Sequence, residues 1–164
     1  MDYAFLGPTG VRVSKICLGT ATFGVAPGVE EAQRVVHAAL DVGIDFFDTA
    51  NVYGATPTFD RPGAPPAAER EPAEQILGRA LAGRRDQVVI ATKCGERRFD
   101  PAAGLSRRYV IQEVEQSLRR LGTESSVVVE SGFAPLLDRT PESADPSKSW
   151  LRRRPEVRAS RARR

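Results

Sequence analysis

The chain has 164 residues, of which 41% are hydrophobic and 27% are charged, a composition typical of one globular domain. No stretch approaches the ~18 apolar residues of a membrane span, and the first ten residues lack the features of a secretory signal. The two cysteines, Cys17 and Cys94, have neither CxxC nor CxxH spacing. This pattern excludes a zinc site or disulfide framework and predicts buried free thiols in a reducing compartment, the cytoplasm.

The net charge of +3 is unevenly distributed along the chain. Residues 151–164 contain seven arginines and one glutamate, whereas the other 150 residues contain 17 basic and 20 acidic groups. A mildly acidic body is therefore followed by a strongly basic tail, which indicates two segments of different character.

The first predicted element is a β-hairpin at residues 3–16, where two apolar stretches flank the turn sequence Gly-Pro-Thr-Gly. Residues 16–23 form a short apolar run typical of a buried strand. Residues 30–42 have apolar side chains at helical spacing and are followed by a glycine. Residues 44–48 predict the next strand.

The second part of the chain repeats this alternation. Residues 55–72 are rich in proline, glycine and alanine and predict a long loop. Residues 73–81 and 106–121 predict helices, the second with a serine at its N-cap position. Residues 88–94 and 126–129 predict strands. Alternating strands and helices favour parallel βα units, so the expected fold class is α/β.

Three residues stand where parallel barrels place catalytic groups, at or just after the carboxyl ends of strands. Asp48 ends a predicted strand, Tyr53 follows it in the loop, and Lys93 lies at the end of the strand after the next helix. An ammonium near a phenol stabilises the phenolate, and a carboxylate can hold that ammonium in place. Such a tyrosine could protonate a carbonyl oxygen while hydride reaches its carbon. A purely structural Asp–Lys pair beside a loop tyrosine fits the spacing equally well.

Other familiar signatures are missing or uninformative. No G-x-G-x-x-G follows a strand, so the sequence gives no support for a Rossmann dinucleotide site. The single histidine, His37, lies inside the first predicted helix, and we interpret it as structural or exposed.

Five segments carry a family resemblance: LGPTGVRVSKICLGTATFG, DFFDTANVYG, AEQILGRAL, VVIATK and QSLRRLGT. In this order they resemble the aldo-keto reductase superfamily from about Tyr3 to Thr123. The resemblance implies the N-terminal half of a (β/α)8 TIM barrel with an N-terminal hairpin. It further implies reduction of small aldehydes or ketones with NADPH, Tyr53 as general acid, and Asp48 and Lys93 as the groups that tune it. Thr20 and Asp48 would line the cofactor side.

The resemblance ends near the last predicted strand, at residues 126–129. The family's catalytic histidine aligns with Gly132, and Glu130 is a nearby candidate for that position. We expect a partial barrel at residues 1–130 and a divergent, disordered, Arg-rich tail at residues 131–164. A frameshift or truncation between roughly Thr123 and Ser143 would explain the change of composition.

The sequence thus predicts a truncated NADPH-dependent carbonyl reductase that is inactive as it stands. Activity through assembly with another half-barrel is one alternative. A second is binding of nucleic acid or an anionic surface through the basic tail. No aromatic residue lies among those arginines, so a solvated tail is the preferred interpretation. No metal site is expected.

Overall fold

The computed structural model describes residues 1–95, 104–124 and 127–131. The residues in the two gaps and all residues from 132 onward lie outside this part, including the predicted basic tail. The predicted boundary at residue 131 therefore stays a prediction. Within the described residues, no helix is long and apolar enough to cross a membrane.

The chain opens with the predicted hairpin, in which β1 (Tyr3–Phe5) pairs antiparallel with β2 (Arg12–Ser14). The hairpin is fixed to the amino-terminal end of the following sheet by polar contacts. The Tyr3 hydroxyl donates to the Gly43 carbonyl at 2.9 Å, and the Ser14 amide donates to the Asp45 carboxylate at 2.7 Å. Asp45 directly precedes a strand, so the hairpin lies at the end opposite to the strands' carboxyl ends.

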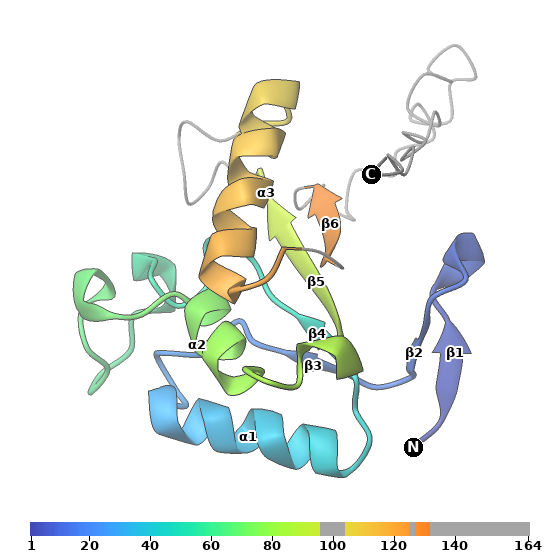
Figure 1. The fold of residues 1–164 in the computed structure, drawn as a ribbon. Helices are drawn as coiled ribbons and strands as arrows, with labels where there is room; N and C mark the ends of the chain where they lie inside the picture. Colours follow the sequence, from blue (N-terminus) through green and yellow to red (C-terminus); the bar gives the residue numbers. More distant parts are fainter. Residues whose placement is uncertain (96–103, 125–126, 132–164) are drawn as a thin grey trace, which may run out of the picture. The chain divides into compact units, whose positions relative to one another are not determined.

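Four parallel strands form the main sheet in the order β3–β4–β5–β6 (Figure 1). Their bounds are Cys17–Gly19, Phe46–Asp48, Val89–Cys94 and Val127–Ser131. The helices α1 (Val29–Asp41), α2 (Ala73–Ala80) and α3 (Arg107–Leu121) connect successive strands. The predicted parallel βα units are confirmed, because each strand pairs with the next one in the chain.

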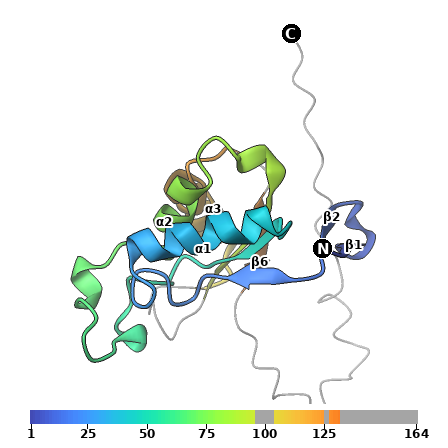
Figure 2. The same ribbon diagram turned by 90° about the horizontal axis from the view of Figure 1, so that it is seen from below.

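The three helices cover one face of the sheet, with α1 packed on α2 and α2 on α3 (Figure 2). Apolar side chains from this face of the sheet and from the helices form one buried cluster, which includes Phe47, Ile90, Val36, Ile76 and Leu121. Leu18 packs against it as well. Because side chains alternate along a strand, the neighbours of these residues lie on the other face.

This alternation corrects the prediction for one cysteine. Cys94 is buried at 4% exposure, as expected, but Cys17 is exposed. Cys17 is adjacent to Leu18 in β3, so it lies on the face opposite the helices, and no described residue covers it sufficiently to bury it.

The first strand of the main sheet, β3, is shorter than the sequence suggested. Its predicted range was 16–23, whereas β3 ends at Gly19. The amide of Phe23 donates to the carbonyl of Thr20 at 3.0 Å, so the chain turns immediately after Thr20. The helix at 106–121 is confirmed, and Ser106 is its N-cap, accepting from the Tyr109 amide at 3.2 Å. His37 is exposed, with Nε2 2.9 Å from the Ala80 carbonyl oxygen, which supports the structural interpretation.

Candidate active site at the carboxyl ends of β4 and β5

Asp48 and Lys93 end neighbouring strands on the face opposite the helices. Asp48 pairs in register with Ala91, so Lys93 extends two residues further along β5. The Lys93 Nζ lies 2.5 Å from Asp48 Oδ2 and also donates to the Thr49 carbonyl at 3.0 Å. The side chains are 14% and 32% exposed, respectively, so the ion pair borders solvent. The carboxylate therefore fixes the ammonium at the carboxyl ends of β4 and β5.

Tyr53 is brought to this ion pair by the chain that follows β4. The Asn51 amide donates to the Lys93 carbonyl at 3.0 Å, and the Tyr53 amide donates to the Ala50 carbonyl at 3.2 Å. The Tyr53 carbonyl in turn accepts from the Ala73 amide at the start of α2 at 3.0 Å. The Lys93 Nζ lies 5.2 Å from the centroid of the Tyr53 ring, within cation–π range. The three predicted catalytic residues thus lie together.

Thr20 supports Asp48 from the neighbouring strand. Its amide and hydroxyl both donate to the Asp48 carbonyl, at 2.9 and 3.0 Å. The residue has 0% exposure, so its side chain holds the end of β4 and offers no surface in this structure. Its predicted contact with a cofactor stays a prediction.

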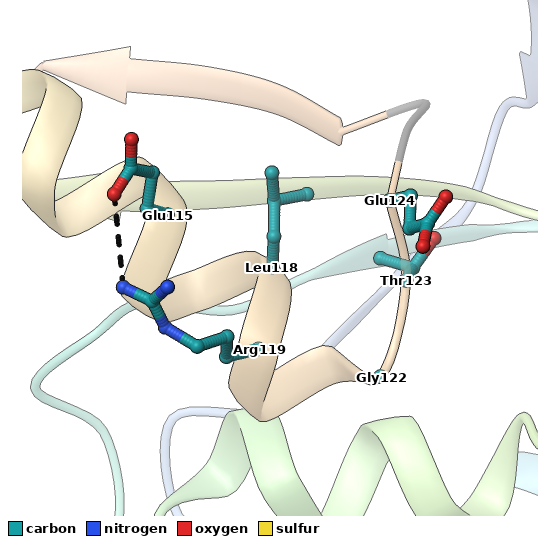
Figure 3. A pocket seen from close by; sticks show the side chains of 6 residues that line it. All are labelled: Glu115, Leu118, Arg119, Gly122, Thr123 and Glu124. Atoms are coloured by element: carbon teal, nitrogen blue, oxygen red, sulfur yellow. Dashed lines mark ion pairs between the residues drawn. The ribbon is translucent and has the colours of Figure 1, made fainter.

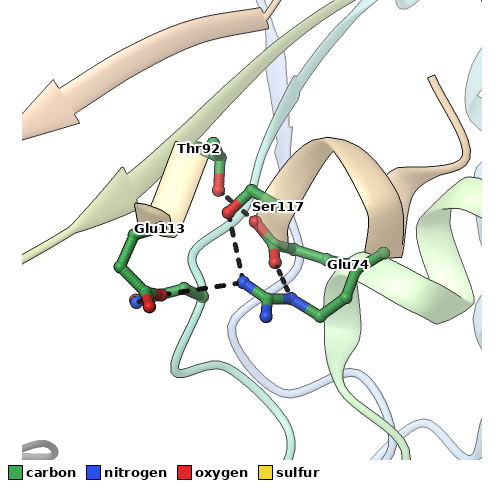
Figure 4. Close-up of polar contacts among 6 residues, drawn as sticks. Glu74, Thr92, Glu113 and Ser117 are labelled. Atoms are coloured by element: carbon green, nitrogen blue, oxygen red, sulfur yellow. Dashed lines mark hydrogen bonds and ion pairs between the residues drawn. The ribbon is translucent and has the colours of Figure 1, made fainter. Parts of the chain in front are cut away.

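A buried polar network lies on the helix side of β5, and sequence reasoning missed it (Figure 4). The Glu74 carboxylate in α2 has 0% exposure, accepts from the Thr92 hydroxyl at 2.6 Å and pairs with the Arg120 Nε at 2.5 Å. The Ser117 hydroxyl accepts from Arg120 at 3.2 Å. The sequence contained one indication of this network, because the charged Glu74 lies on the apolar face of its helix, three residues before Leu77.

A second branch of this network reaches the loop that carries Tyr53. The Asn51 side-chain amide donates to the Glu113 carboxylate at 2.7 Å, and Glu113 lies 3.9 Å from Arg120. Asn51 follows Asp48 by three residues. Helix α3 therefore helps to position the backbone between Asp48 and Tyr53, a link that joins residues 62 positions apart.

Burial raises the pKa of the Cys94 thiol, and the nearby negative charges of Glu113 and Glu74 raise it further. Cys94 lies on the helix side of β5, next to Lys93. Its thiol is therefore protonated and covered, which makes it unsuited to act as a nucleophile.

The candidates for the family's fourth catalytic position are only partly described. The backbone of β6 places Glu130 in register with Lys93 on the neighbouring strand. Gly132 lies outside the described residues. The assignment of either residue to that position stays a prediction.

One cavity lies away from this cluster. A shallow cavity of about 700 Å³ is lined at the C-terminal end of α3 by side chains that include Glu115, Leu118 and Arg119 (Figure 3). Because α3 runs antiparallel to the strands, this cavity lies toward the amino-terminal end of the sheet. It is therefore distinct from the carboxyl-terminal end of the sheet, where Asp48 and Lys93 meet. Among the described residues, no group of His, Cys, Asp and Glu side chains could hold a metal ion.

Parallel βα units bring Asp48, Lys93 and Tyr53 together at the carboxyl ends of β4 and β5. The profile of the Aldo/keto reductase family matches residues 15–129, and the chain belongs to this family. It is 41% identical over 133 residues to the uncharacterized oxidoreductase YrpG of Bacillus subtilis. It is 32% identical over 127 residues to the L-glyceraldehyde 3-phosphate reductase of Escherichia coli. Each alignment covers 76% of this chain, but only 37% and 34% of the respective relative.

Solved structures agree with these sequence matches. A structure assigned as an aldo-keto reductase of Pseudomonas aeruginosa is 34% identical, with a TM-score of 0.61. The match covers 77% of this chain and 45% of that one. The chain therefore spans less than half the length of the relatives that it matches, and the resemblance to the family's fold is confirmed over that part.

Proposed function

We propose that the described residues form the proton-donating part of an NADPH-dependent carbonyl reductase site, with Tyr53 as the general acid. The observation that carries this proposal is the placement of the Lys93 ammonium, 2.5 Å from the Asp48 carboxylate and 5.2 Å from the Tyr53 ring centroid. A purely structural Asp–Lys pair would not need a tyrosine held at this distance by three backbone hydrogen bonds in the connecting loop.

The proposed roles follow from charge and position. The substrate carbonyl carbon takes up a hydride, and its oxygen takes the proton of the Tyr53 hydroxyl, giving an alcohol and a phenolate. The Lys93 ammonium stabilises that phenolate electrostatically in the half-buried setting of the site. Asp48 keeps the ammonium in place, while the second bond from Lys93 to the Thr49 carbonyl fixes its direction. Lys93 and Asp48 thus act through Tyr53.

Open space beside Asp48 supports the proposed binding of a flat cofactor ring. Asp48 is 32% exposed, and its register partner Gly19 has no atom within 4 Å of the position that a Cβ would occupy. A reduced nicotinamide cofactor supplies the hydride when it is bound. Asp48 is the described residue that fits a contact with it, whereas Thr20 supports Asp48 from behind.

We further propose that the 164-residue chain alone does not turn over substrate. It matches only 37% of the length of YrpG, so most of that relative's length has no counterpart in the matched part. A fluorescence titration with NADPH should accordingly give no low-micromolar binding. Saturable binding in that range would contradict this part of the proposal.

A chimera tests the catalytic assignment directly. We would join residues 1–131 to the part of YrpG that the alignment does not cover and measure NADPH oxidation with small aldehydes and ketones. Tyr53→Phe keeps the ring but removes the transferable proton, so we expect turnover to fall by about 10²–10⁴-fold. NADPH affinity should change little.

Tyr3→Phe is the matched control, because Tyr3 lies in the hairpin at the opposite end of the sheet and bonds to Gly43. This variant should keep its turnover. If the chimera is active and Tyr53→Phe keeps most of that activity, Tyr53 is not the proton donor. The Asp48–Lys93 pair would then have only a structural role.

A further inference from the structure

The backbone that carries Tyr53, residues 51–54, is bonded to two different elements. The Asn51 amide donates to the Lys93 carbonyl of β5 at 3.0 Å, and the Tyr53 carbonyl accepts from the Ala73 amide of α2 at 3.0 Å. These two bonds set the path of the backbone. Two side-chain contacts, one on each side of Tyr53, add to them.

The contact on the C-terminal side comes from Arg70. Its side chain has 0% exposure, and its guanidinium pairs with Asp60 at 2.7 Å. It also donates to the carbonyls of Gly54 and Thr56, at 2.7 and 2.6 Å. A buried guanidinium with this many acceptors indicates one conformation of the loop that follows Tyr53, because the charge would otherwise be costly to bury.

The contact on the N-terminal side comes from Glu113, in the middle of α3. The Asn51 Nδ2 donates to the Glu113 Oε2 at 2.7 Å. In the part of the chain that the structure describes, nothing bonds to the buried Asn51 Oδ1. The orientation of the Asn51 side chain therefore depends on Glu113. Because the acceptor is a carboxylate, this hydrogen bond is charge-assisted and stronger than one between neutral groups.

Arg120 ties this support to α2 (Figure 4). Its guanidinium lies 3.9 Å from the Glu113 carboxylate and 2.5 Å from that of Glu74, which is fully buried. Glu74 directly follows Ala73, whose amide bonds to the Tyr53 carbonyl. The same arginine thus contacts the support on one side of Tyr53 and the first turn of the helix that supports the other.

We propose that Glu113 is a positioning residue, which acts through Asn51 to hold the Tyr53 ring beside the Lys93 ammonium. The proposal rests on the function proposed above and adds to it a residue of α3 that touches none of the three catalytic candidates. A general acid works only within hydrogen-bonding distance of the substrate oxygen, so a small displacement of the tyrosine would lower turnover.

The first test uses the uniformly ¹⁵N-labelled 164-residue chain and amide hydrogen exchange. Glu113→Ala should speed exchange of the Tyr53 amide by about tenfold or more, the effect of losing one hydrogen bond to a charged group. Glu113→Gln keeps an oxygen that can accept from Asn51, so exchange should stay within about threefold of the parent chain. Glu115→Ala is the matched control on the same helix. It breaks an exposed pair with Arg119 and should leave Tyr53 exchange unchanged.

A reversal of the hydrogen bond separates direct contact from general loss of stability. Asn51→Asp places a second carboxylate opposite Glu113 and should speed Tyr53 exchange. Adding Glu113→Gln supplies an amide that can donate to the new carboxylate, so the double variant should exchange more slowly than Asn51→Asp alone. Exchange at Val36, which is fully buried in α1, shows whether each variant folds.

These outcomes decide the proposal. Parent-like Tyr53 exchange in folded Glu113→Ala overturns it, as does the absence of recovery in the folded double variant. If Glu113→Ala does not fold, the reversal still decides, because its variants keep the size of both side chains.

The chimera with YrpG then links position to turnover. Glu113→Ala should lower kcat by about tenfold to a hundredfold, and the KM for NADPH should change by less than about twofold. Faster Tyr53 exchange with an unchanged kcat would reject the positioning role and leave the proton donor intact. An active Tyr53→Phe chimera would reject the proton donor, whereas the exchange measurements, which need no activity, would still show whether Glu113 holds the segment.

Discussion

Two ion pairs lie on opposite faces of β5. Thr92 bonds to the carboxylate of one pair, and the next residue, Lys93, belongs to the other. Thr92 faces the helices and donates to Glu74, whose carboxylate is fully buried against Arg120. Lys93 faces the other way and binds Asp48 at the border of solvent. Both pairs have a nitrogen–oxygen distance of 2.5 Å, so their lengths do not distinguish them.

Their surroundings do distinguish them. The Glu74 carboxylate is engaged by Thr92 and Arg120, groups from two elements other than its own helix, so the pair joins β5 and α3 to α2. The Asp48–Lys93 pair keeps part of its surface open and has the Tyr53 ring beside it. A pair whose carboxylate is fully buried contributes to stability through the groups it would leave unpaired, whereas a pair whose carboxylate is partly exposed can also meet a ligand.

The largest expected effect is on the enclosed pair. Glu74→Gln keeps the shape of the side chain but leaves the Arg120 guanidinium without its main counter-charge. We expect a loss of about 3 kcal/mol in the free energy of unfolding, measured by urea denaturation. Glu71→Gln, which breaks the more exposed Glu71–Arg79 pair, is the matched control and should cost less than about 1 kcal/mol. Equal losses in both variants would show that burial does not separate the two kinds of pair.

A smaller effect is expected for the open pair. Asp48→Asn keeps an oxygen that can accept from Lys93, and Lys93 retains its bond to the Thr49 carbonyl. The free energy of unfolding should therefore fall by only about 1 kcal/mol. In the chimera with YrpG, the same change should lower turnover well beyond what this loss of stability explains. A loss of stability as large as that of Glu74→Gln would instead make Asp48 a structural residue.

Local patterns predicted most of the fold because each element is encoded within a few residues. The helical spacing of apolar side chains, the serine at position 106 and the turn glycines are all short-range signals, and they locate the helices and the hairpin. The early end of β3 was missed, because it depends on a turn in which Phe23 bonds to Thr20. The exposure of Cys17 was missed, because burial of a strand residue depends on which face is covered.

The candidate site was predictable only where strand ends specify it. Asp48 and Lys93 converge because parallel neighbouring strands bring their carboxyl ends to one edge. The support for the Tyr53 loop was not predictable in this way. The Asn51–Glu113 bond joins distant helices and loops, and the role of Arg70 depends on how a loop folds around it. Neither contact leaves a periodic signature in the sequence.

The smallest expected effect is on the pH dependence of stability. It comes from Cys94, which lies on the same face of β5 as Thr92. Burial, then the charges of Glu113 and Glu74, raise the pKa of its thiol in the folded chain. The unfolded chain therefore releases this proton at lower pH, from about pH 8.5. Stability should be unaffected below that pH and should fall as the pH rises through the folded-state pKa, by less than the ~1.4 kcal/mol per pH unit of one fully linked proton. Urea denaturation across this range should show a shallower decline for Cys94→Ala than for the parent chain. If Cys94→Ala and the parent decline in parallel, the helix-facing side of β5 does not disfavour the charged thiolate, and the contrast between its two faces is weaker than the geometry indicates.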